Sequence, residues 1–467
     1  MSIHQIIYTS CAMGIEGGNG QQIFSYDRNM TNDVLIIMRG MLSYNKPRLD
    51  YNDINNVPQA FTYRRLTNGM CAVSLGTYLG QDYVGHRQGN FIVHAVAGDE
   101  SNFTSYPCEY YGGKTLMSEA PNEVRHNKKP KLLDEPKLRS GKCVNYKNIE
   151  AFLRTDNRNA MFSEILTALL KFGSAQKRVL ICDNATNTIL WIAALHYTLP
   201  IEIALNVSFT SYEYSPDLSM SRVCGVILQG TAYNRNDANK HFTFDFINNL
   251  FPEGLLRSDE SAVHFHDFMK NSLCNDRDSL NRFHEFIRTK LTYRTADEEY
   301  YNVYSLFRLF TEKLDNISLS ILIDAVRAWE KYAIEDIRYE IVYRLLESCE
   351  TILSAPEEYF NEAIDVIFAN LDSIPVAKAS QIQGIFKTLI ADRVIAMLRS
   401  ETNEQMFRVS YDKIFHQCHE NRISLYKELK RDAYPEKLLA VLINSIDNDI
   451  GWRILFIKTL ICEVMRH

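Results

Sequence analysis

The sequence lacks the features that would place it in a membrane, a secreted or a dedicated nucleic-acid-binding class. It has no stretch of about 18 consecutive apolar residues, which a transmembrane helix needs. Its first residues lack the basic-then-apolar order of a secretory signal peptide. The formal net charge is -6, so the chain as a whole has no cationic field that would concentrate nucleic acid. We therefore expect a cytoplasmic protein that does not associate with membranes.

The ten cysteines are scattered, and none forms the close C-x-x-C pair that structural zinc sites usually use. His416, Cys418 and His419 lie close together, and the two histidines would share one face of a helix. No third or fourth ligand lies near them, which favours ordinary surface histidines. We expect reduced thiols, no metal site and no bound cofactor.

Length and composition indicate a folded protein of more than one domain. Apolar residues make up 46% of the 467 residues and charged residues 23%, as in ordinary globular proteins. A chain of this length exceeds what a single hydrophobic core normally serves. The patterns predict an α+β architecture. It comprises a β-rich N-terminal domain (1–123), a basic linker (124–144), a small α/β middle domain (145–250) and an all-helical domain (255–467).

Strands dominate the predicted N-terminal domain. Aromatic and β-branched residues favour strands at 3–8, 22–26, 61–64, 70–75 and 91–97. The glycines between residues 14 and 20 indicate a turn that needs positive φ.

The predicted linker contains Pro130 and Pro136 among many lysines and arginines and shows no apolar periodicity. This composition is typical of an exposed tether. A basic run is also what a phosphate-contacting patch looks like, so nucleic-acid binding by this segment stays open as an alternative.

The middle block alternates helix and strand signals, and the remainder is helical. Helical spacing covers 148–172 and 186–197, and strand signals cover 178–182, 206–210 and 222–228. Beyond residue 258, apolar stripes recur at helical spacing, including further stripes at 342–371. They show no clean repeat period, which favours a bundle or an irregular helical array. One stripe consists of Leu322, Ala325, Val326, Trp329 and Ala333.

Cys11, His94 and Asp82 provide a thiol, an imidazole and a carboxylate within one predicted domain. Such a set can act as nucleophile, base and orienting group, as in a cysteine-dependent hydrolase. His94, however, lies in an apolar strand, where a histidine is more commonly a hydrogen-bonded core residue. Spacing alone does not decide between the two interpretations.

The segment 78–90 is the most distinctive in the chain, with several glycines, Asp82 and Arg87 ahead of a strand. Asp82 and Arg87 either pair across a tight loop or are presented to a partner. The sequence leaves both alternatives open.

These segments together resemble the bacterial GTPase-associated protein family. The first motif is Ile-Tyr-Thr-Ser-Cys at 7–11, followed by Gly14, Gly17-Gly18 and Phe-Ser-Tyr at 24–26. The second is Tyr-Leu-Gly-Gln-Asp-Tyr at 78–83 with Gly85, Arg87, Gly89-Asn90 and His94. Residues 191–195, Leu199-Pro200, 208–212 and Pro216 look like the family's middle domain. Met13 stands where the family usually has arginine.

The resemblance implies a non-catalytic adaptor or sensor of a bacterial conflict or antiviral system, acting beside a GTPase or other NTPase. We therefore predict a scaffold or sensor subunit that binds a protein partner, with a cysteine-dependent hydrolase as the alternative. The predicted partner-binding residues are Gly17, Gly18, Tyr78, Asp82, Arg87 and Asn90.

Overall fold

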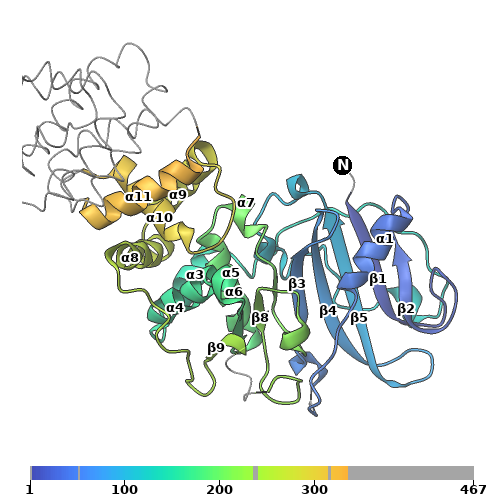
Figure 1. The fold of residues 1–467 in the computed structure, drawn as a ribbon. Helices are drawn as coiled ribbons and strands as arrows, with labels where there is room; N and C mark the ends of the chain where they lie inside the picture. Colours follow the sequence, from blue (N-terminus) through green and yellow to red (C-terminus); the bar gives the residue numbers. More distant parts are fainter. Residues whose placement is uncertain (1–2, 51–52, 235–239, 314–316, 335–467) are drawn as a thin grey trace, which may run out of the picture. The chain divides into compact units, whose positions relative to one another are not determined.

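The computed structural model describes residues 3–50, 53–234, 240–313 and 317–334. The chain divides into two compact units, Met1–Tyr304 and Ser305–His467. Within the described residues of the first unit, nine strands form one sheet in the order β2-β1-β5-β4-β3-β7-β8-β6-β9 (Figure 1). The predictions for 342–371 and for His416, Cys418 and His419 lie outside the described residues.

The N-terminal half of the sheet is antiparallel, which confirms the predicted β-rich domain. Each of its strands pairs antiparallel with its neighbours. The strands are β1 (His4–Cys11), β2 (Gly20–Tyr26), β3 (Ala60–Arg65), β4 (Cys71–Gln81) and β5 (Gln88–Gly98). The helical segments are α1 (Asn32–Met38), η1 (Arg39–Met41), η2 (Ile54–Asn56), η3 (Glu100–Asn102), η4 (Pro107–Tyr110) and α2 (Asn122–Arg125).

Both faces of this antiparallel half are covered. Successive side chains of a strand point to opposite faces, so Ile6 and Ile7 enter two different cores. The core around Ile6 includes Leu35 and Met38 of α1. The core around Ile7 includes Val124, which is 1% exposed. The start of the predicted linker therefore covers the second face.

The basic segment continues along the edge of the sheet. The Leu133 N–H donates to the Tyr26 carbonyl (2.9 Å), and the Arg28 N–H donates to the Leu133 carbonyl (3.1 Å). The Ser25 hydroxyl donates to the Lys131 carbonyl. Because β2 is an edge strand, its outward backbone groups need partners, and this segment supplies some of them. The backbone around Leu133 is therefore attached to the sheet.

The half of the sheet that belongs to the middle domain is parallel. Helices pack on it, as predicted. It consists of β6 (Arg178–Cys182), β7 (Phe209–Thr210), β8 (Val223–Gly225) and β9 (His241–Asp245). Its helices are α3 (Tyr146–Leu153), α4 (Arg158–Leu170), α5 (Phe172–Ala175), α6 (Ala185–Tyr197), α7 (Ile201–Ala204) and η5 (Pro216–Leu218).

Two details differ from the sequence-based expectation. The helical stretch predicted at 148–172 is interrupted between α3 and α4, where Asp156 and Asn157 adopt positive φ (52° and 56°). Residues at positive φ cannot continue a right-handed helix. The edge strand β9 was not predicted.

The two halves of the sheet join where β3 pairs antiparallel with β7. Tyr63 lies opposite Phe209 in this register. The Ser211 N–H donates to the Phe61 carbonyl (2.8 Å), and the Ser211 hydroxyl accepts from the Phe61 N–H (2.9 Å). The Tyr63 hydroxyl donates to the Leu205 carbonyl (2.6 Å). The two predicted domains therefore share one hydrogen-bonded sheet.

All elements described from residue 255 onward are helices. They are α8 (Glu260–Cys274), α9 (Arg277–Lys290), α10 (Glu299–Thr311) and α11 (Leu319–Tyr332). α8 packs against α3 and α4, so it belongs to the same compact unit as the middle domain. The stripe predicted on α11 is buried, and Trp329 is 1% exposed. Among the described residues, no helix is long and apolar enough to cross a membrane.

The junction between the two halves can be tested with Ser211→Ala. The substitution leaves the buried Phe61 N–H without its acceptor, which costs about 1–3 kcal/mol. We expect the opening free energy of the β3 and β7 amides, measured by hydrogen exchange, to fall by this amount. Ser258→Ala, at an exposed position, is the control and should change it by less than about 0.5 kcal/mol. Equal effects of both variants would contradict a stabilising role for this contact.

Candidate functional site

Two loops that the sequence singles out lie at the same end of the antiparallel half. In the pairing of β1 with β5, Thr9 lies opposite Ile92, so the end of β1 lies beside the beginning of β5. The β1–β2 loop (12–19) and the β4–β5 loop (82–87) therefore emerge side by side, at the lower right of Figure 1. We call these two segments the hairpin loops.

The glycines of the first hairpin loop adopt the backbone conformation predicted for them. Gly17 has φ 83° and Gly18 has φ 94°, values that favour glycine over other residues. Both are exposed. The Gly17 N–H donates to the Gly14 carbonyl (3.1 Å), which closes a tight turn.

Asp82 organises the second hairpin loop. Its Oδ1 accepts hydrogen bonds from the N–H groups of Gly85 (2.7 Å) and Arg87 (3.2 Å), and also from that of Val84 (3.3 Å). These bonds, the one from Gly85 above all, lower the pKa of the carboxyl group. Arg87 Nε lies 3.7 Å from Asp82 Oδ2, while the Arg87 side chain remains 70% exposed. Asp82 is thus buried and orders the loop, and Arg87 is accessible.

Asn90 holds the base of the loops, and Tyr78 lies on β4 before the second loop. Asn90 is 3% exposed, and its Oδ1 accepts from the Thr9 hydroxyl and the Ser10 N–H (3.4 Å each). Tyr78 is half-buried, with the Lys46 ammonium 5.4 Å from its ring centroid. Of the six residues predicted to bind a partner, Gly17, Gly18 and Arg87 are therefore the exposed ones.

His94 makes two hydrogen bonds in the core. The Met117 N–H donates to Nδ1 (3.0 Å), so the ring proton resides on Nε2, which donates to the Gln5 Oε1 (2.9 Å). Burial lowers the pKa of the ring to about 4, so it is neutral near pH 7. This is the hydrogen-bonded core histidine that its apolar surroundings suggested.

Cys11 lies apart from His94. His94 pairs with Ile7, and Cys11 is four residues farther along β1, which corresponds to roughly 13 Å. Cys11 is 1% exposed, and burial raises the pKa of its thiol. The carboxylate of Asp82 is occupied by its own loop. The structure does not bring these three groups together as a catalytic set.

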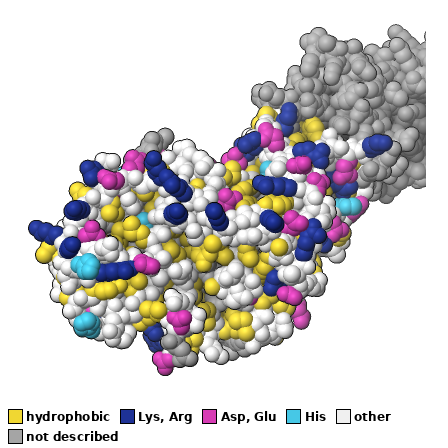
Figure 2. Space-filling model, turned by 180° about the vertical axis from the view of Figure 1, so that it is seen from behind, with side chains coloured by type: hydrophobic (Ala, Val, Ile, Leu, Met, Phe, Trp, Pro, Cys, Tyr) yellow, Lys and Arg dark blue, Asp and Glu magenta, His cyan; other side chains and the backbone are white. Residues whose placement is uncertain are grey.

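Two ion pairs involve residues of the basic segment. Arg28 pairs with Asp134 (2.8 Å), and Arg125 pairs with Glu119 (2.6 Å). Figure 2 shows lysine and arginine side chains spread over one face of the molecule, many of them beside acidic ones. Nucleic-acid binding by this segment remains the alternative raised by its sequence.

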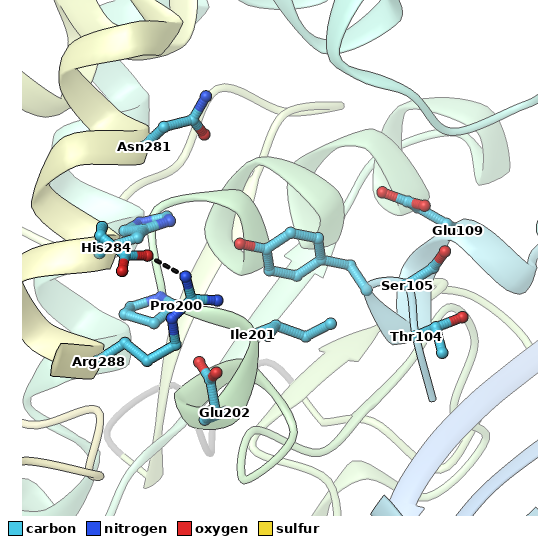
Figure 3. A pocket seen from close by; sticks show the side chains of 11 residues that line it. Thr104, Ser105, Glu109, Pro200, Ile201, Glu202, Asn281, His284 and Arg288 are labelled. Atoms are coloured by element: carbon cyan, nitrogen blue, oxygen red, sulfur yellow. Dashed lines mark hydrogen bonds and ion pairs between the residues drawn. The ribbon is translucent and has the colours of Figure 1, made fainter. Parts of the chain in front are cut away.

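The described residues also form a cavity of about 440 Å³ that the sequence did not reveal. Three separate segments line it: 104–109 around η4, 200–202 at the start of α7, and 281–288 on α9. Figure 3 shows the labelled α9 residues facing Thr104, Ser105 and Glu109 across it. No local motif marks such a site, because its residues are distant in sequence. Among the described residues, no group of three or more potential metal ligands was found.

The fold is that of a mixed α/β protein whose antiparallel and parallel halves share one sheet. Residues 2–133 match the family model of GTPase-associated protein 1, N-terminal domain type 2. Residues 149–248 match that of GTPase-associated protein 1, middle domain. The chain therefore contains two domains of the GTPase-associated protein 1 family, and the domain names indicate association with a GTPase. Searches of curated proteins and of solved structures gave no match.

The role of Asp82 in ordering its loop can be tested with Asp82→Ala. We expect the amides of Val84, Gly85 and Arg87 to exchange at least about tenfold faster with solvent deuterium, because they lose their acceptor. Asp82→Asn keeps an acceptor oxygen and should have a smaller effect.

The same carboxyl group gives a pH dependence with a defined sign. The pKa of Asp82 is lower in the folded loop than in an unfolded chain. Ionised Asp82 therefore stabilises the folded loop at a pH above the usual pKa of a carboxyl group, and this stabilisation is lost as the pH falls through the lowered pKa. Unchanged exchange in Asp82→Ala, at matched pH, would contradict this role.

The reactivity of Cys11 can be compared with that of Cys143, which is exposed. Iodoacetamide should modify Cys143 at least ~10-fold faster than Cys11, because Cys11 is buried and its thiol is held protonated. Peptide mapping by mass spectrometry after brief labelling measures both rates. Labelling of Cys11 as fast as that of Cys143 would restore the hypothesis of a reactive nucleophile.

Proposed function

We propose that this protein is a non-catalytic scaffold or sensor subunit that binds a GTPase or other NTPase through its hairpin loops. The observation that carries the proposal is the pair of matches to domains named for association with a GTPase. The geometry adds a surface suited to such binding, since two loops emerge together from one rigid sheet.

The β4–β5 hairpin loop is ordered before any partner binds. Asp82 fixes three backbone N–H groups of one loop, and Asn90 connects its base to β1. A loop that is already ordered loses less conformational entropy on binding. The exposed guanidinium of Arg87 can donate two parallel hydrogen bonds to a carboxylate or a phosphate. We assign Arg87 the contact with the partner, and Asp82 and Asn90 the support of the loop.

The proposed biological setting is a bacterial conflict system directed against phage. This part of the proposal rests on the resemblance of the hairpin-loop motifs to a family with that predicted role. In this setting, the protein would relay a signal to its NTPase partner.

Arg87→Glu tests the proposed contact. We first expect the tagged wild-type protein to copurify from its native host with a protein that hydrolyses GTP or ATP. Reversing the charge of Arg87 should then weaken binding of the purified partner about tenfold, because an exposed interface cation is replaced by an anion. Calorimetry measures the affinity. Arg282→Glu, an exposed position on α9, is the matched control and should leave it unchanged.

Three outcomes would count against the proposal. One is the absence of any copurifying NTPase, and another is equal affinity of the Arg87→Glu variant. A third is a partner or covalent adduct that is lost only in Cys11→Ser, which would point to cysteine chemistry. If the conflict setting holds, Arg87→Glu should also remove protection against phage in the native host, whereas Arg282→Glu should retain it.

A further inference from the structure

The cavity between η4, α7 and α9 has walls that are fixed by hydrogen bonds outside it. The Tyr106 hydroxyl donates to the Leu199 carbonyl (2.8 Å), and its ring packs edge-on against Tyr197 at 4.8 Å. The Tyr197 hydroxyl in turn donates to Glu109 Oε1 (2.5 Å). At about 440 Å³, the cavity lies within the size range of small-molecule sites.

Most of the charged side chains that line the cavity are acidic. Three carboxylates line it, those of Glu109, Glu202 and Glu285. Within the described part of the chain, the Glu202 carboxylate makes no hydrogen bond or ion pair. Figure 3 shows Glu202 between the α9 side and the side that carries Glu109.

The cavity offers little positive charge of its own. The guanidinium of Arg288 is paired with Glu285. His284 Nε2 donates to the Thr198 carbonyl (3.1 Å), which leaves Nδ1 as an acceptor. Burial lowers the pKa of His284 to about 4, so the ring is neutral near pH 7. Three carboxylates against one guanidinium leave the cavity acidic.

We propose that this cavity binds a small organic cation with several N–H donors, such as an alkyl polyamine. An ammonium group has three donors and no acceptor, which complements carboxylates and the free nitrogen of His284. Its methylene chain would lie against the aromatic ring of Tyr106 and against Pro200 and Ile201. A metal ion fits less well, because the aromatic and aliphatic part of the wall provides no ligands to it.

The test compares two molecules of nearly the same length and shape, hexamethylenediamine and hexanediol. Isothermal titration calorimetry with the full chain should show saturable binding of the diamine and none of the diol. Glu202→Gln should weaken diamine binding about tenfold, because it removes one charge-assisted contact. Glu253→Gln, at an exposed position away from the cavity lining, is the control and should bind the diamine as the wild type does.

A second variant keeps the test decisive if Glu202→Gln misfolds. Glu285→Gln frees the Arg288 guanidinium within the cavity and should also weaken binding of the diamine. Circular dichroism establishes that each variant is folded. The proposal is wrong if the diamine does not bind saturably, if the diol binds as well, or if a folded cavity variant binds like the Glu253→Gln control. None of these results depends on whether a GTPase binds the hairpin loops.

Discussion

The antiparallel pairing of Tyr63 with Phe209 joins two sheets of different type into one. On one side the strands are antiparallel, and on the other they are parallel. β7 has only two residues, so this junction depends on few backbone hydrogen bonds. Ser211 reinforces the junction, because its backbone N–H and its side-chain hydroxyl both form hydrogen bonds with the backbone of Phe61 on β3. The Tyr63 hydroxyl also donates to the Leu205 carbonyl in the turn before β7. Both residues are buried, so loss of this hydrogen bond would leave a buried polar group without a partner.

The shared sheet affects the two candidate sites differently. The hairpin loops connect β1 with β2 and β4 with β5, so both lie within the antiparallel half of the sheet. The cavity includes the segment at η4, which belongs to the N-terminal domain, and the turn at Pro200, which belongs to the middle domain. The cavity therefore depends on the two family domains being held in one arrangement. A separate N-terminal domain would lack the two walls that the start of α7 and α9 provide.

How far the sequence predicted these features depends on how local their causes are. A high content of aromatic and β-branched residues predicted the N-terminal strands, because this preference acts within one strand. The covering role of the basic segment was not predicted, because Val124 and the Leu132-Leu133 pair are short apolar interruptions of a polar segment without periodicity. The burial of Asp82 and Asn90 follows from contacts with β1 and with their own loop, which no residue pattern states. The cavity, assembled from three distant segments, left no sequence signal.

The hairpin loops also show why a distinctive motif does not by itself identify contact residues. Asp82, Asn90 and Arg87 fall within one short stretch, yet only Arg87 has an exposed side chain. Substituting Asp82 would disorder the loop and thereby move Arg87, so lost binding would not distinguish support from contact. Charge reversal at Arg87 removes its contact with Asp82 Oδ2, but the three hydrogen bonds to Oδ1 come from backbone N–H groups and do not need the Arg87 side chain. The exposed arginine is therefore the position at which loop order and partner contact can be separated.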